Sequence, residues 1–110
     1  APAALPAQAA APVLIMLDAL ARLQAFDAFE ALAAVLEAVA MPWRERRQAL
    51  AELYLRHGYA DSAAEEWIAA CEQGGVDAQA LRGLAAVAVA RGLDEDARVF
   101  TAEAEALAAV

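Results

Sequence analysis

Identical residues recur at an offset of 34 positions, and this period constrains the fold more than any other feature of the sequence. It is clearest at the glycines, since Gly58 and Gly92 are 34 residues apart. The other identities are Leu50 with Leu84, Ala51 with Ala85, Ala63 with Ala97 and Ala70 with Ala104. A repeat of this length holds one helical hairpin, which buries its apolar flank against the next copy. The period therefore predicts stacked hairpins in an all-α chain.

The remaining composition also favours helices, because alanine dominates and residues that prefer strands are scarce. An Ala/Pro-rich stretch at residues 1–12 predicts a linker, and apolar residues at helical spacing predict six helices after it. We expect Asp27 and Asp77 to cap helices, Pro42 to occupy a first turn, and Gly58 to end a helix in the left-handed conformation. The predicted domain covers residues 13–110, with hairpins at residues 13–41, 44–77 and 78–110.

The hairpin at residues 44–77 resembles the tetratricopeptide repeat (TPR) family. The matching residues are Leu50, Ala51 and Tyr54 on the first helix, and Gly58, Tyr59, Ala63, Trp67 and Ala70 around the turn and on the second. The likeness is weaker over residues 78–110, where Ala88 and Thr101 replace aromatic residues, and residues 13–41 keep only the apolar pattern. The resemblance implies a short right-handed superhelix of about six helices.

The resemblance also implies a binding surface, because TPR arrays typically hold an extended or helical peptide in the groove lined by each first helix. Mapped onto this chain, that groove contains Glu45, Gln48, Glu52, Leu55, Arg56, Gln79, Arg82, Ala86 and Val89. The family's clamp for a C-terminal carboxylate depends on lysines and asparagines, and the chain has neither. Glu45 and Glu52 favour a partner that brings basic residues and an apolar anchor. The competing interpretation is a solvated face that binds nothing.

Charge and hydropathy argue against two other classes of partner. The formal net charge is −8, and the one dense basic cluster, Arg44, Arg46 and Arg47, is interrupted by Glu45. Nucleic-acid binding requires a basic face, so nucleic acid is not expected. The longest strongly apolar run, residues 13–17, is too short to cross a bilayer, so no membrane insertion is expected. Cys71 is the only cysteine, which excludes an intrachain disulfide and fits a cytoplasmic location; we expect it to be a buried, inert thiol.

The sequence contains no recognisable catalytic arrangement. His57 is the only histidine, and its place before Gly58 suits interaction with the carbonyls at a helix end. Helix-macrodipole stabilisation is a sufficient reason for Glu65 and Glu66. One histidine cannot supply the paired Glu-x-x-His motifs of a helical metal site, and there is no phosphate-binding glycine loop. We therefore expect no enzyme, no metal and no cofactor.

The last helix suggests a second surface. Its apolar residues Phe100, Leu107 and Val110 are not followed by a polar capping helix. We therefore expect that either further chain in the parent protein covers this helix, or these residues form a self-association edge. The leading hypothesis is a protein-interaction module from a larger bacterial protein. The bacterial origin is suggested by the composition, because a chain rich in alanine and with arginine in place of lysine is typical of GC-rich genomes. A homodimerisation domain is one alternative. The other is an accessory domain of a bacterial enzyme, because residues 54–71 and 81–85 resemble TPR tails of glycosyltransferases.

Overall fold

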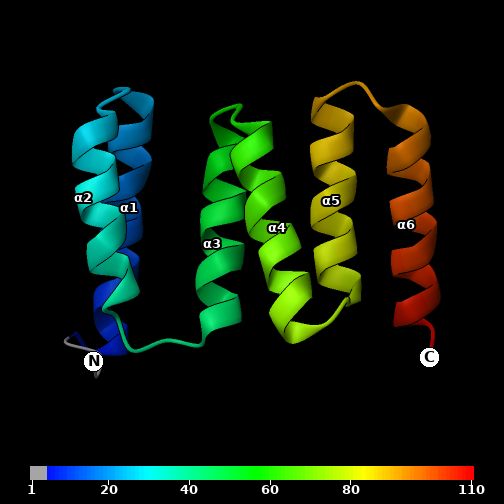
Figure 1. Cartoon of the computed structure of the whole chain (residues 1–110), viewed down its shortest axis with the longest axis horizontal. Coiled ribbons are helices and arrows are strands. Elements are labelled where there is room, and N and C mark those ends of the chain that lie inside the picture. Colours follow the sequence, from blue (N-terminus) through cyan, green and yellow to red (C-terminus); the bar gives the residue numbers. More distant parts are fainter. Residues whose placement is uncertain (1–4) are drawn as a thin grey trace. The chain divides into compact units, whose positions relative to one another are not determined.

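The computed structural model describes residues 5–110, and each regular element in that range is a helix. A short 3-10 helix, η1 (Ala7–Ala9), precedes α1 (Ala10–Arg22), α2 (Phe26–Glu37), α3 (Trp43–Arg56), α4 (Ala60–Gly74), α5 (Ala78–Ala90) and α6 (Asp94–Ala108) (Figure 1). This architecture confirms the predicted all-α class and the arrangement of six helices in adjacent pairs. The chain divides into two compact units, Ala1–Arg46 and Arg47–Val110. The division falls inside α3.

The first unit is built on the α1–α2 hairpin, and its N-terminal part differs from the predicted linker. Helix α1 begins at Ala10, so the last residues of the 1–12 stretch are helical, with Pro12 in the first turn, where a missing N–H costs nothing. Leu5 accepts a hydrogen bond from Ala40 N (2.9 Å) and donates one to Ala38 O (3.1 Å). The stretch is therefore packed from Leu5 onward, while residues 1–4 of the predicted linker lie outside the described residues.

The turn inside each hairpin repeats with the 34-residue period. The three turn residues with positive φ are Gln24 (57°), Gly58 (83°) and Gly92 (73°). A backbone bond between residues five positions apart closes each turn: Ala25 N to Leu20 O (3.0 Å), Tyr59 N to Tyr54 O (2.9 Å) and Leu93 N to Ala88 O (2.8 Å). The second helices then begin at Phe26, Ala60 and Asp94. The predicted left-handed conformation of Gly58 is confirmed. The first hairpin forms the same turn with Gln24 in place of a glycine.

The second unit has its core where α3, α4 and α5 meet. Trp67 is 4% exposed and lies in a cluster of small and medium residues, whose buried members are Ala51, Ala63, Ala64, Ala80 and Val87. Gly83 allows this packing, since a Cβ there would lie 2.5 Å from Cδ2 of Trp67 and closer still to two other indole atoms. A glycine inside a helix costs about 1 kcal/mol relative to alanine. Contact between α5 and the indole ring offsets that cost.

Helix capping follows the predictions in part. Asp77 caps α5 as expected, with its Oδ1 accepting from Ala80 N at 2.8 Å. The prediction for Asp27 is wrong, because the cap position of α2 is Ala25 and Asp27 lies in the first turn, near the positive end of the helix dipole. Pro42 stands immediately before α3, and its carbonyl accepts from Arg46 N (3.1 Å).

Candidate functional site

The second unit contains a hollow of about 250 Å³ on the surface of α3, α4 and α5. Glu52 and Leu55 come from α3, Trp67 from α4, and the remaining lining residues Gln79, Arg82, Gly83 and Ala86 from α5. Five of the nine residues predicted for the groove are therefore brought together in one place: Glu52, Leu55, Gln79, Arg82 and Ala86.

Helical spacing explains why these residues share one surface. Glu52 and Leu55 are three residues apart on α3, while Gln79, Arg82 and Ala86 follow one another at steps of three and four on α5. Side chains at such steps project from the same face of a helix. Glu52 and Ala86 are also separated by one 34-residue repeat, so the two helices contribute corresponding faces. The period in the sequence thus predicts the juxtaposition.

The floor of the hollow is apolar and its rim carries one charge of each sign. Glu52 accepts a 3.4 Å hydrogen bond from Gln48 Nε2, and both Glu52 and Arg82 are exposed. Within the described part of the chain, the side chain of Arg82 makes no hydrogen bond or ion pair, and that of Glu52 makes no ion pair. Two opposite charges therefore border one small apolar depression without neutralising each other, which leaves both available to groups on a ligand.

The other predicted groove residues do not line the hollow. Glu45 belongs to the unit Ala1–Arg46. Gln48 is half-buried and bonds to Glu52, and Arg56 is exposed near the end of α3. Val89 is 63% exposed on the last turn of α5. Four of the nine residues predicted for the groove therefore lie outside this hollow.

Two lining residues, Trp67 and Gly83, were not predicted as part of the site. In the sequence Trp67 is predicted only as a matching position of the TPR-like pattern, yet this core residue also lines the hollow. The available signal was Gly83, a glycine in the middle of a strongly helix-forming run. Such a glycine commonly marks a close approach by another group.

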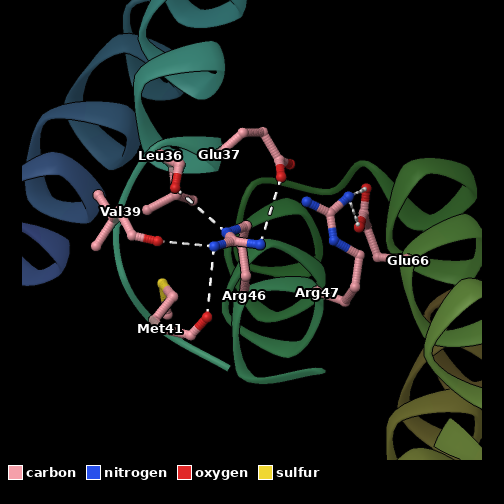
Figure 2. Close-up of polar contacts among 7 residues, drawn as sticks. All are labelled: Leu36, Glu37, Val39, Met41, Arg46, Arg47 and Glu66. Atoms are coloured by element: carbon pink, nitrogen blue, oxygen red, sulfur yellow. Dashed lines mark hydrogen bonds and ion pairs between the residues drawn. The ribbon is translucent and has the colours of Figure 1, made fainter. Parts of the chain in front are cut away.

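The arginine cluster at the start of α3 has a structural role (Figure 2). Arg46 is 8% exposed and donates to the carbonyl oxygens of Leu36 (3.2 Å), Val39 (2.8 Å) and Met41 (3.5 Å). Its Nη1 also lies 3.5 Å from Oε2 of Glu37. Leu36 lies in the last turn of α2, and Val39 and Met41 follow the helix, at the end where a positive charge is favoured. Arg46 therefore serves as a side-chain cap for α2.

The next residue, Arg47, pairs with Glu66 on α4, and Figure 2 shows its guanidinium directed at that carboxylate. The Nη1 to Oε2 distance is 3.0 Å, and the two side chains are 15% and 17% exposed. The sequence-based account of Glu66 as a macrodipole residue is therefore insufficient. Glu66 lies beyond the first turn of α4, and its role is an ion pair with α3.

Two of the three residues in the predicted apolar edge of α6 are exposed. Phe100 is half-buried, whereas Leu107 is 46% exposed and Val110 fully exposed. A shallow hollow of about 400 Å³ on this helix is lined by Ala97, Arg98, Thr101, Ala102 and Glu105. Subtracting one repeat from Arg98, Thr101 and Glu105 gives Ala64, Trp67 and Cys71, the α4 residues in the cluster with α5. The face of α6 that corresponds to a stacking surface therefore carries the polar residues Arg98, Thr101 and Glu105 beside Ala97 and Ala102.

Other chemistry-bearing residues are dispersed. No group of three or more His, Cys, Asp or Glu residues within the described range could hold a metal ion. His57 is half-buried one residue before Gly58, and its backbone N donates to Tyr54 O (3.1 Å). Cys71 is half-buried rather than fully buried, and it packs against the core of the second unit. None of the helices in the described range is long and apolar enough to cross a membrane.

Comparisons with known proteins add no name to this geometry: no family model, curated protein or solved structure matches the chain.

Proposed function

We propose that the chain is a TPR-like module that binds a segment of another protein in the hollow of its second unit. The supporting observation is that corresponding faces of α3 and α5 line one apolar depression, bordered by Glu52 and Arg82. The three turns at 34-residue spacing support the TPR-like part of the proposal. Interaction is the activity for which such a surface is suited, since it offers shape and charge without a reactive group.

The lining residues define the chemistry of the bound segment. Leu55, Ala86 and the indole of Trp67 form the apolar part of the lining, and a hollow of about 250 Å³ has room for one aliphatic side chain. Glu52 attracts a basic residue on the α3 side, and Arg82 attracts a carboxylate on the α5 side. The partner segment therefore carries an apolar anchor between charges of opposite sign.

A charge swap tests this proposal. A displayed library of random peptides is selected on the wild-type chain and on the double variant Glu52→Arg with Arg82→Glu, which keeps the net charge at −8. We expect wild-type binders to contain an apolar anchor with a basic residue on one side and an acidic residue on the other. The swapped variant should bind these peptides at least about tenfold more weakly than the wild type does. It should itself select peptides with the reversed order of charges.

The matched control is the swap Arg98→Glu with Glu103→Arg, which exchanges two exposed charges on α6 and should leave peptide affinity unchanged. The binding site is mapped by amide chemical shifts, with changes expected at Leu55, Ala86 and the Trp67 indole. Equal binding by the wild type and the swapped variant, or shift changes confined to another surface, would overturn the proposal.

A further inference from the structure

One position of the 34-residue repeat carries an acid on α1 and on α3 but alanine on α5. The residues at this position are Asp18, Glu52 and Ala86. On α1, Asp18 accepts a hydrogen bond from Arg22 Nη2 at 3.1 Å. On α3, Glu52 accepts one from Gln48 Nε2 at 3.4 Å. Both donors lie four residues from the acid, so the carboxylate at this position is paired along one face of its own helix.

On α5 the donor of this pair is present and the acceptor is missing. Arg82 lies one repeat after Gln48 and four residues before Ala86, as Gln48 lies four residues before Glu52. Within residues 5–110, the exposed guanidinium of Arg82 makes no hydrogen bond or ion pair. A guanidinium offers five N–H donors, and a carboxylate is its strongest common acceptor. Alanine at residue 86 therefore leaves Arg82 without the acceptor that the repeat supplies on α3.

Alanine at residue 86 also provides space in the hollow. Ala86 is half-buried and lines the hollow of about 250 Å³ together with Leu55 and Trp67. Gly83 precedes it on the same helix and has no side chain, at a point where a Cβ would overlap the Trp67 ring. A longer side chain at residue 86 would occupy part of the hollow. The same substitution within the repeat thus leaves both an apolar space and an unpaired guanidinium beside it.

We infer that Ala86 is the specificity-determining residue of the hollow, and that the bound segment supplies the carboxylate that α5 lacks. This inference rests on the proposed binding of a segment in the hollow. An Asp or Glu of the segment pairs with Arg82, and its aliphatic anchor fills the space beside Ala86. Residues four apart on a helix have Cβ atoms about 6 Å apart, and an extended chain advances about 3.3 Å per residue. The acid therefore lies within about two residues of the anchor.

Restoring the acid tests this inference. Ala86→Glu places on α5 the residue that α3 has at this position, four residues after Arg82, where it can pair with the guanidinium. The probes are peptides selected on the wild-type chain from a displayed random library, each synthesised with its acidic residue and with the corresponding amide. On the wild type, the amide copy should bind about tenfold more weakly than its parent. On Ala86→Glu, the parent should bind at least about tenfold more weakly than on the wild type, and the change to the amide should cost less than about twofold.

Two further variants separate the effect of charge from the effect of volume. Ala86→Gln fills a similar volume without a charge, so it should weaken all the peptides but keep the difference between each parent and its amide copy. Ala90→Glu adds the same charge one turn further along α5, at an exposed residue that does not line the hollow. It should change the affinity for each peptide less than about twofold. Circular dichroism checks that each variant is folded.

The outcomes distinguish this inference from the proposed function. If no selected peptide changes the amide shifts around the hollow, the proposed function and this inference both fail. If peptides bind in the hollow but the change from acid to amide costs the same on the wild type and on Ala86→Glu, this inference alone is overturned. Selected peptides whose acid lies more than about two residues from the anchor would also overturn this inference and leave the proposed function intact.

Discussion

The α1–α2 hairpin and the hairpins of the second unit form the same turn from different residues. Gly58 and Gly92 reach the left-handed region without strain, whereas Gln24 occupies it with a side chain. A non-glycine residue there costs about 1 kcal/mol. The closing hydrogen bonds are nevertheless alike, 3.0 Å in the first hairpin and 2.9 and 2.8 Å in the others. The turn is therefore maintained by its closing backbone hydrogen bond, and glycine only lowers the conformational energy of the positive φ.

The two units also differ at the position that Ile15 and Gly83 share in the repeat. On α5 that position faces an indole ring and must be glycine, and on α1 it is exposed and accommodates isoleucine. The same register position thus requires glycine in one hairpin and tolerates a branched side chain in another. The neighbouring helix, and not the helix itself, sets the requirement.

Exchanging these two residues should have the largest effect. Gly83→Ile places a branched side chain inside the space of the Trp67 ring and should destabilise the second unit by about 3 kcal/mol or more. Ile15→Gly should cost the first unit only about 0.5 kcal/mol of helix propensity. Amide hydrogen exchange, read separately for the amides of each unit, measures both changes. A loss of similar size in the two variants would contradict the comparison.

Removing the α2 cap should have an intermediate effect confined to the first unit. Arg46→Met keeps much of the side-chain volume but removes the charged donor to the carbonyls of Leu36 and Val39, which retain only their backbone bonds from Val39 N and Met41 N, and should cost about 2 kcal/mol. Hydrogen exchange should then rise in α2 while α5 and α6 stay unchanged. Arg46→Lys serves as the graded control, because one ammonium cannot reproduce the planar donor fork. Faster exchange in α5 would show that Arg46 also stabilises the second unit.

Exchanging the turn residues should have the smallest effect and opposite signs in the two hairpins. Gln24→Gly should stabilise the first unit by about 0.5–1 kcal/mol, because glycine relieves the positive φ. Gly58→Gln should destabilise the second unit by about 1 kcal/mol. A Cβ at residue 58 would meet nothing within 4 Å, so that cost is purely conformational. Amide hydrogen exchange, measured separately for each unit, reports both changes in stability. A loss of stability in Gln24→Gly would refute the explanation that the positive φ at residue 24 is strained.

Much of the fold could be predicted because it depends on local chemistry. The alanine-rich composition and the helical spacing of apolar residues predicted the helices, and the glycines and Asp77 predicted where several of these helices begin or end. The 34-residue offset predicted which faces of α3 and α5 correspond. The capping of α2 by Arg46 could not be predicted from residue spacing. Arg46 donates to carbonyls five to ten residues earlier in the chain, and no local sequence pattern specifies the conformation of the connection between them. The pairing of Arg47 with Glu66 is likewise a contact between helices.

The sequence by itself therefore determined the helices, their order and the repeat, because helix propensity and turn chemistry act over a few residues. Only the tertiary structure decided that Trp67 is both core and wall of the hollow, that Gln24 completes a glycine-type turn, and that Ile15 on α1 is exposed. The physical reason is that burial and pairing depend on which side chains meet across helices. Identical positions in the repeat acquire different roles when their neighbours differ.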